Sequence, residues 1–304
     1  MAMRVNAPAS QLRTLVTSAL GKEPVHWHRP HTGLSAAQRF VVRFADGSSA
    51  FVKAAVDDST EGWLRTEREI LSSVEGSFVP RLLAWMEDGE RPVLLVEDLS
   101  GAHWPADHRP VTWKSGQFAL LFATLREIAA ATPPVSLPGA EMDFRPQWPS
   151  IAREAEEFLA LGLCSEVWFR EAIDELVEAE KSVPLAGHAL VHGDVRSDNV
   201  CFVGDRTVLV DWSAALRGHP HHDLTTALTT LPLEGGPDPF DILPEAGAWA
   251  AYHAGRSVRF AYHETHAPEW LRTVVKRIST ICLSWAARSL DLPRWNGLHW
   301  SEIR

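Results

Sequence analysis

The segment from 190 to 212 (LVHGDVRSDNVCFVGDRTVLVDW) carries residues whose types and spacing could do chemistry. Asp194 ends an apolar approach, Asn199 stands five residues later, and Asp211 follows a short strand, a turn and a second strand. Two carboxylates and one carboxamide are therefore expected at the ends of a small hairpin. Such a set of oxygens suits Mg²⁺, which takes one or two protein carboxylates together with carbonyl and phosphate oxygens. Asp194 is then free to orient a hydroxyl group.

A single charge interrupts an apolar strand in the first third of the chain. Lys53 is the only charged residue in the run 50–56, and a lone charge in such a strand needs a partner. Glu67 lies in the amphipathic segment that follows, whereas Glu69, two residues on, would face elsewhere on a helix. Beyond the hairpin, the segment 218–223 (GHPHHD) leads into a predicted helix.

The arrangement of residues in the segment 190–212 resembles the catalytic loop of the kinase-like fold. The His-Gly-Asp opening and the later Asp-Trp are similar to the aminoglycoside phosphotransferase and choline kinase branch, whose members are small-molecule kinases. The resemblance implies ATP, or alternatively GTP, as the phosphoryl donor, Mg²⁺ as the cofactor and a small-molecule hydroxyl group as the acceptor. It implies that Asp194 is the base, that Asn199 and Asp211 bind the metal, and that Asp223 is structural.

The resemblance also covers the predicted nucleotide-binding lobe. It implies that Lys53, paired with Glu67, contacts the nucleotide phosphates. The segment PVLLVEDL (92–99) resembles the strand that leads into the hinge, where backbone groups around Glu97 to Leu99 would bind adenine. The phosphate loop would be GLSAA (33–37), with Gly33 and Ser35, and its backbone amides could cap a phosphate.

Arg196 departs from the pattern of the family. It stands two residues after Asp194, where the small-molecule branch commonly has His and protein kinases have Lys. Its planar, permanently charged guanidinium could contact the transferred phosphate as a catalytic group. Equally, it could pair with Asp198 and be structural, and the residues leave both readings open.

The elements that must position these residues divide the chain into two parts. Predicted strands at 39–44, 50–56, 82–86 and 93–97 accompany helices at 10–20 and 60–75. Long helices then follow at 113–131, 150–160, 165–182, 221–231, 244–260 and 268–290, interrupted by strands within 200–211. The order predicts an α+β class and a two-lobed, protein-kinase-like fold. The small β-sheet-rich nucleotide-binding lobe would span 1–97, and the larger, mostly helical catalytic and acceptor-binding lobe 98–304.

Composition excludes several classes of function. The 304 residues carry a formal charge of -10, and residues 98–304 hold most of it, with 18 Lys and Arg against 27 Asp and Glu. An acidic chain is a poor binder of nucleic acid, whose affinity comes from neutralised phosphates. Three scattered Cys favour a reducing, cytoplasmic setting, and the absence of a 20-residue apolar stretch argues against a membrane partner. A monomer and a homodimer both remain open.

The acidity of residues 98–304 favours an amine-bearing acceptor, with an aminoglycoside-type antibiotic preferred by the resemblance. Choline-like amines, aminosugars and metabolite alcohols remain alternatives within the same chemistry. Several carboxylates could bind amines, although acidic surfaces usually serve solubility: Glu154, Glu156, Glu157, Glu234, Asp238, Asp241 and Glu245.

Three other functions compete with this interpretation. A protein kinase would have Asp-Phe-Gly, Ala-Pro-Glu and a glycine-rich loop before Lys53, and the sequence has none of them. A non-catalytic pseudokinase usually lacks the base or a metal ligand. A zinc hydrolase could use His219, His221 and His222, but zinc sites usually need a second, distant pair of ligands.

The 13 Trp residues form an excess that needs a separate explanation. Trp63, Trp249, Trp270 and Trp285 fall at helical positions where a core is expected. Trp148, Trp295 and Trp300 are predicted in loops or near the C-terminus. There, an aromatic face could hold an amine by a cation-π contact.

Overall fold

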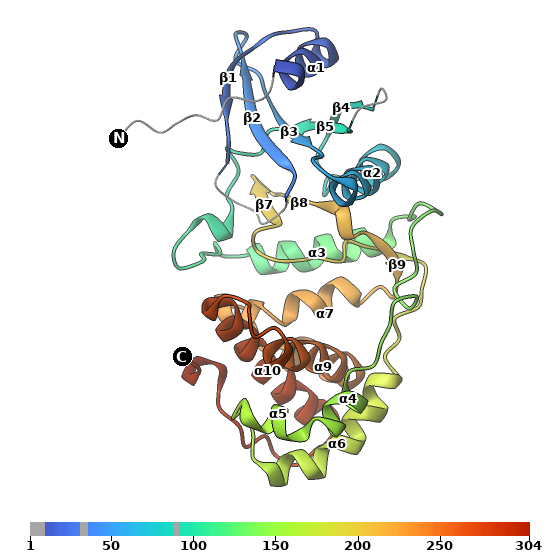
Figure 1. Cartoon of the computed structure of the whole chain (residues 1–304), viewed down its shortest axis with the longest axis vertical. Helices are drawn as coiled ribbons and strands as arrows, with labels where there is room; N and C mark the ends of the chain where they lie inside the picture. The colour runs from blue at the N-terminus through green and yellow to red at the C-terminus, as the bar shows by residue number, and fades with distance from the viewer. Residues whose placement is uncertain (1–9, 31–35, 88–90) are drawn as a thin grey trace. The chain divides into compact units, whose positions relative to one another are not determined.

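The computed structural model describes residues 10–30, 36–87 and 91–304, and its trace is drawn in Figure 1. The chain forms two compact units, each described here by itself. The first comprises Met1–Pro138 and His188–Arg217, and the second comprises Gly139–Gly187 and Gly218–Arg304. The segment 190–212 therefore belongs to the same compact unit as the N-terminal strands. The lobe boundary expected at Glu97 stays a prediction.

A five-stranded antiparallel sheet in the order β1-β2-β3-β5-β4 organises the first unit. Its strands are β1 (Pro24–His28), β2 (Gln38–Phe44), β3 (Ser49–Ala54), β4 (Leu82–Met86) and β5 (Val93–Glu97). The β2–β3 hairpin turns at Gly47, whose φ of 82° suits glycine. Side chains alternate along β3, so Val52 is buried in the core and Lys53 lies on the opposite face.

Two helices cover this sheet. α1 (Ser10–Leu20) contributes Leu12 and Val16 to a core that also contains Trp27, Phe40, Phe44, Val42, Val52 and Leu95. α2 (Asp58–Ser73) packs against β4 and β5, and it begins with a reciprocal capping box between Asp57 and Thr60. Its buried face includes Leu64, Glu67 and Ile70, which are three residues apart in the sequence.

The rest of the first unit carries the segment that contains the candidate catalytic residues. Its elements are η1 (Pro105–Asp107), α3 (Gln117–Ala130), β6 (Ala189–Val191), β7 (Val200–Val203), β8 (Arg206–Leu209), η2 (Trp212–Ala214) and β9 (Leu216–Gly218). α3 packs against β6 and β8, and α2 packs against η2. Two helices of the unit therefore support the strand ends on which the chemistry depends.

The second unit is helical. Its elements are α4 (Trp148–Arg153), α5 (Ala155–Ala160), α6 (Glu166–Lys181), α7 (His222–Leu228), η3 (Leu231–Glu234), α8 (Pro239–Ile242), α9 (Gly247–His263), α10 (Glu269–Ser289) and η4 (Trp300–Glu302). α9 is the central helix because it packs against α10, α6, α5, α4 and α7. Small residues on its buried face, Ala250, Ala251 and Ala254, allow these close approaches.

Several tryptophans of the second unit are structural. Trp148, Trp168 and Trp285 are at most 1% exposed, and each indole N–H donates to a backbone carbonyl. The prediction that Trp148 lies in a loop and could face an acceptor is wrong, because this residue begins α4 in the core. The core positions predicted for Trp63 and Trp270 are also wrong, since these side chains are 44% and 59% exposed.

The observed elements follow most of the predicted ones. The strand expected at 93–97 is confirmed as β5, but the single helix expected at 150–160 is wrong because the chain breaks at Glu154 into α4 and α5. β1 was not expected from the sequence. Within the described ranges, every helix is too short or too polar to cross a lipid bilayer.

Candidate active site

A small hairpin and the loop before it bring the predicted metal ligands to the same end of two strands. β7 and β8 pair with Val200 opposite Leu209, so residues 199 and 211 lie just outside the paired region. The Val210 N–H donates to the Asn199 carbonyl over 2.9 Å, which extends the ladder to the open end. Asn199 is therefore held by backbone pairing, and Asp211 directly follows the paired Val210.

Asp194 is positioned by Asn199. The Asn199 amide nitrogen donates to both the backbone carbonyl and the Oδ2 carboxylate oxygen of Asp194, each over 2.9 Å. Burial raises the pKa of Asp194, against the opposing effects of Arg196 and of the Asn199 hydrogen bond. With the Asn199 nitrogen directed at Asp194, the amide oxygen is the atom that Asn199 can offer to a cation.

Arg196 pairs with two carboxylates. Its guanidinium lies 3.3 Å from Asp194 and 3.2 Å from Asp198, and its side chain is 45% exposed. Both readings of this residue therefore retain support. The ion pair with Asp198 is present, and the exposed guanidinium lies next to the candidate base.

His192, to which the sequence pattern assigned no role, links the loop to the hairpin. The Asp194 N–H donates to Nδ1 of His192 over 3.2 Å, while Nε2 donates to the Val210 carbonyl over 3.0 Å. The imidazole is buried and packs against Trp212 with ring centroids 4.6 Å apart. These two bonds fix the tautomer and hold Asp194 at a set distance from the strand that leads to Asp211. Its place in the tripeptide 192–194 was the available signal.

Gly193 is required by the backbone of this loop, and its replacement by alanine tests that requirement. Its φ is 82°, and a Cβ there would lie 2.3 Å from the Ala214 carbonyl oxygen. We expect Gly193→Ala to lower the free energy of unfolding by more than about 3 kcal/mol, measured by urea denaturation, because left-handed strain and a backbone clash add.

Gly204→Ala is the matched control for this variant. Gly204 has a φ of 60°, but a Cβ there would meet none of the described atoms within 4 Å. Its replacement should cost only about 1 kcal/mol, from backbone strain alone. Equal costs at Gly193 and Gly204 would contradict the close approach to Ala214.

Lys53, Glu67 and Asp211 form an ionic cluster in which Lys53 and Glu67 are largely buried. The Lys53 ammonium lies 2.7 and 2.8 Å from the two Glu67 oxygens and 3.6 Å from Asp211 Oδ1. Burial alone would lower the pKa of Lys53, but the two carboxylates outweigh it and raise the pKa above its ordinary value. Burial would raise the pKa of Asp211, but chiefly the Lys53 charge holds it below the ordinary value. Asp211 is therefore an ionised carboxylate and remains 36% exposed.

The pairing expected for Lys53 is with Glu67, and the structure has it. Glu69 is instead half-buried on another side of α2, where it accepts a hydrogen bond from the Ser136 hydroxyl. Asp211 itself adopts the left-handed conformation, with φ of 65° and ψ of 62°. This conformation is uncommon outside glycine, and such strain concentrates at functional sites.

Replacement of Glu67 by glutamine should destabilise the first unit. The Glu67 side chain is 2% exposed, so Glu67→Gln leaves the buried Lys53 ammonium without its closest counter-charge. We expect the free energy of unfolding to fall by about 3 kcal/mol in a urea titration. Glu69→Gln on the same helix is the control and should change it by less than about 0.5 kcal/mol. Identical transitions for the two variants would refute the buried pair.

The predicted hinge, residues 97–99, uses several of its polar groups internally. The Glu97 N–H donates to the Arg81 carbonyl, and the Leu99 carbonyl accepts hydrogen bonds from Ala102 N–H and the Trp104 indole. The Glu97 carboxylate binds Arg206. Any contact of this segment with adenine would therefore use its other backbone groups. The predicted phosphate-loop residues Gly33 and Ser35 lie outside the described residues.

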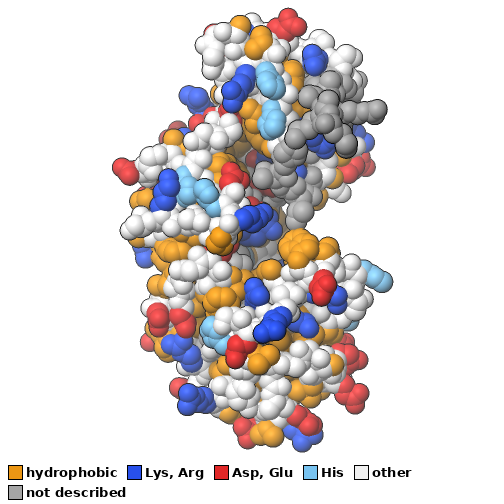
Figure 2. All heavy atoms as spheres, turned by 90° about the vertical axis from the view of Figure 1, so that its left-hand side faces the viewer, with side chains coloured by type: hydrophobic (Ala, Val, Ile, Leu, Met, Phe, Trp, Pro, Cys, Tyr) orange, Lys and Arg blue, Asp and Glu red, His pale blue; other side chains and the backbone are white. Residues whose placement is uncertain are grey.

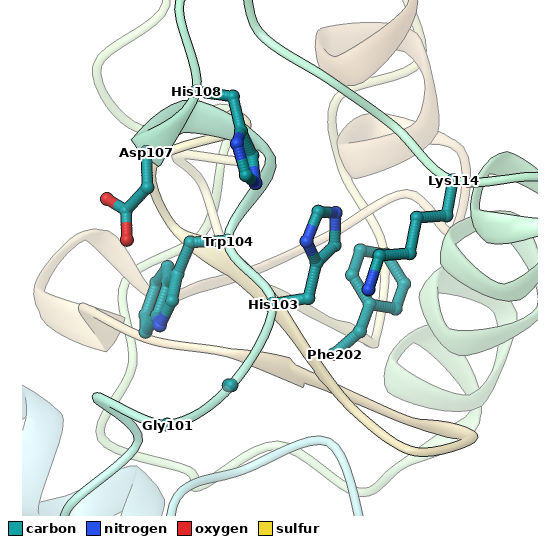
Figure 3. A pocket seen from close by; sticks show the side chains of 8 residues that line it. Gly101, His103, Trp104, Asp107, His108, Lys114 and Phe202 are labelled. Carbon is teal, nitrogen blue, oxygen red and sulfur yellow. The ribbon is translucent and has the colours of Figure 1, made fainter.

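A pocket of about 490 Å³ opens beside the hinge, on the side of η1. Figure 3 shows its lining, which is contributed by Gly101, Ala102, His103, Trp104, Asp107, His108, Lys114 and Phe202. The backbones of His103 and Phe202 exchange two hydrogen bonds, of 3.0 and 2.9 Å, so the segment after the hinge is attached to β7. The pocket does not include Lys53, Asp194 or Asp211.

The rings of His219, His221 and His222 pack against one another or against Trp249. His219 Nδ1 accepts a hydrogen bond from the His221 N–H, and burial lowers the pKa of His222 to about 4. Within the described part of the chain, no group of three or more His, Cys, Asp and Glu side chains is arranged to hold a metal ion. A zinc site built on these residues is therefore unsupported. A Mg²⁺ site of one carboxylate and one amide has fewer protein ligands than such a group.

Comparison with known proteins identifies both family and fold. A model of the phosphotransferase enzyme family matches residues 28–263. A choline/ethanolamine kinase family protein from Mesorhizobium loti is 16% identical, with 91% of this chain and 97% of that chain covered and a TM-score of 0.52. A macrolide 2'-phosphotransferase from Brachybacterium faecium is 15% identical, with 88% and 97% covered and a TM-score of 0.52.

A third solved structure, a macrolide 2'-phosphotransferase type I, is 17% identical, with 91% of this chain and 98% of that chain covered and a TM-score of 0.53. A search by sequence among curated proteins found no match. At these identities the structural likeness shows the fold, and the predicted α+β, kinase-like fold is confirmed.

Proposed function

The chain belongs to the phosphotransferase enzyme family, and from that premise we propose that it transfers the γ-phosphoryl group of ATP to a hydroxyl group of an amine-bearing small molecule. Membership makes it an ATP-dependent phosphotransferase of the small-molecule kinase type. GTP is the alternative donor. The proposal assigns the acceptor chemistry and the roles of individual residues.

One observation carries the proposal. Lys53, Glu67 and Asp211 meet in one ionic cluster, although they come from a strand, a helix and the end of a hairpin. The same hairpin holds Asn199 against Asp194. A cation for phosphates, a carboxylate and an amide oxygen for a metal, and a second carboxylate for a hydroxyl group therefore belong to a single compact unit.

The residues of the proposed metal site fit Mg²⁺ in kind and in charge. The Asp211 carboxylate is ionised and partly exposed. The Asn199 amide nitrogen donates to Asp194, which leaves the amide oxygen as the atom that could bind a cation. When bound, Mg²⁺ would neutralise charge on the transferred phosphoryl group. Asn199 and Asp211 would hold it, and Lys53 would contact the phosphates of the nucleotide.

Asp194 would orient the acceptor hydroxyl for attack on the γ-phosphorus. The acceptor oxygen forms the new bond to phosphorus as the bond from phosphorus to the β,γ-bridging oxygen breaks, and ADP leaves. The hydroxyl proton passes to the Asp194 carboxylate. Catalysis of this kind depends mainly on position and electrostatics, so two hydrogen bonds that fix Asp194 serve it directly, one from the Asn199 amide and one from the Asp194 N–H to the His192 ring. Arg196 would add a positive charge beside the transferred group.

The acidic residues of the second unit give less support to a polycationic acceptor than their number suggests. Glu154 accepts hydrogen bonds from Arg259 and Tyr262, and these bonds lower its pKa. Arg288 pairs with both Asp238 and Asp241. On the face drawn in Figure 2, acidic and basic side chains lie interspersed. Net charge alone therefore does not favour an aminoglycoside over choline-like amines or aminosugars with a single amine.

An acceptor screen tests the proposal. The full chain with Mg-ATP would be offered aminoglycosides, macrolide and peptide antibiotics, choline and aminosugars, with ADP release and the mass of the product as readouts. We expect one amine-bearing alcohol to gain a single phosphate group. Failure of the chain to bind Mg-ATP in calorimetry would overturn phosphoryl transfer, whereas exclusive turnover of amine-free alcohols would overturn only the acceptor class.

A further inference from the structure

Arg206, the first residue of β8, contacts two segments that lie more than 100 positions earlier in the chain. Its Nε donates to the Ser77 carbonyl over 2.6 Å, and its Nη2 donates to the Val79 carbonyl over 2.8 Å. Nη2 also lies 2.7 Å from Glu97 Oε1, and Nη1 lies 3.3 Å from Oε2. The guanidinium therefore uses all three of its nitrogens on fixed partners.

The other end of this contact is the first residue of the hinge. Glu97 ends β5, its side chain is 15% exposed, and its Oε1 also accepts the Arg81 N–H over 2.9 Å. Burial opposes ionisation of this carboxylate, but the hydrogen bonds from Arg206 and Arg81 hold its pKa below the ordinary value. The Glu97 carboxylate therefore forms an ion pair with Arg206, and this pair fixes the first residue of the hinge.

The segments that Arg206 connects are parts of the proposed site. Arg206 stands five residues before Asp211 on the strand that leads to it. The loop 77–79 follows α2, which carries Glu67, and the Leu209 N–H donates to the Phe78 carbonyl in the same loop over 2.9 Å. One side chain therefore joins the hinge, the loop after α2 and the strand that leads to the candidate metal ligand.

We infer that Arg206 is a positioning residue that holds the hinge in register with β8, so that adenine and the triphosphate of one nucleotide can be bound at the same time. The inference rests on the proposed function. Arginine is required because its planar fork reaches two carbonyls and a carboxylate in different directions. Lysine keeps the charge but has one nitrogen and cannot make this set of bonds.

A comparison of two ligands tests the inference in the full chain. Mg-ATP and magnesium tripolyphosphate, which lacks the nucleoside, would be titrated calorimetrically into the wild type and into Arg206→Lys. We expect the variant to bind Mg-ATP about tenfold more weakly, which corresponds to about 1.4 kcal/mol. Its affinity for tripolyphosphate should stay within about twofold of that of the wild type, because Lys53, the proposed phosphate contact, lies outside the hinge.

Two further variants separate positioning from general loss of stability. Glu97→Gln keeps the shape of the hinge residue and removes the charge that Arg206 binds. Its affinity for Mg-ATP should therefore fall relative to its affinity for tripolyphosphate, but by less than in Arg206→Lys. Ile128 is fully buried on α3, so Ile128→Ala destabilises the first unit without removing any group that Arg206 contacts. It should leave the ratio of the two affinities unchanged.

The outcomes distinguish the inference from the proposed function. The role of Arg206 would be overturned if Arg206→Lys weakened the binding of Mg-ATP and tripolyphosphate equally, or if it left both affinities unchanged. It would also be overturned if Ile128→Ala changed the ratio of the two affinities as much as Arg206→Lys does. Lack of binding of Mg-ATP by the wild type would instead overturn the proposed function. That failure would be seen in the unmutated chain.

Discussion

Replacing Asp194 with alanine is expected to lower turnover at least about a thousandfold, within the range that a positioned base contributes. The loss should appear in kcat, whereas the dissociation constant for Mg-ATP should change by less than about threefold. The reason is geometric. The Asp194 carboxylate is held by Asn199 and would face the acceptor hydroxyl rather than the nucleotide. Turnover and calorimetric binding on the same preparation provide the two measurements.

Asp198→Ala is the matched control for this result. Asp198 lies four residues further along the same loop, is 46% exposed and also pairs with Arg196. Its loss removes a similar charge from the loop but leaves Asp194 and its hydrogen bonds in place, so turnover should stay within about threefold of the wild type. Retention of full activity in Asp194→Ala, or an equal loss in Asp198→Ala, would refute the assignment of the base.

Replacing Asp211 with asparagine is expected to remove the dependence of nucleotide affinity on Mg²⁺. Without the carboxylate, the site keeps only neutral oxygens for the cation and Lys53 loses one of its two counter-charges. The loss of turnover should exceed the roughly 10–100-fold cost of removing a hydrogen bond behind a metal ligand. ATP would be titrated with and without MgCl₂, and the two curves should coincide in the variant.

Asparagine is the informative substitution at this position. The backbone of Asp211 is left-handed, and asparagine tolerates that conformation as well as aspartate does, so the variant should keep its fold. Asp205→Asn, in the exposed turn of the same hairpin, is the control and should retain the full effect of MgCl₂. A metal effect in Asp211→Asn equal to that of the wild type would contradict the proposed ligand.

Local sequence patterns were sufficient for most of the fold. The run at 93–96 is uniformly apolar and, with Glu97, forms strand β5, and the Asp-Gly pair at 46–47 is the turn of the β2–β3 hairpin. The pattern failed where tertiary contacts decide. The segment 24–28 is short, begins with proline and carries two histidines, yet it pairs along β2 as β1. Glu154 interrupts a helical pattern, and its side chain binds Arg259 and Tyr262 on α9.

The sequence by itself determined which residue types could do the chemistry and in which order they occur. The spacing of Asp194, Asn199 and Asp211 follows from the chain, because a short hairpin brings its own two ends together whatever else packs around it. The partner of Lys53 followed from the family resemblance, and helical spacing added only that Glu67 and Glu69 lie on different faces of α2.

Only the tertiary structure decided how those residues are held. The contact of Arg206 with Glu97 joins residues 109 positions apart, and that of Glu154 with Arg259 joins residues 105 apart. Whether a charged side chain is available to a ligand depends on such partners, and their approach is set by the packing of separate elements. Sequence spacing fixes directions within one helix or hairpin, but it carries no information on which distant side chain will meet them.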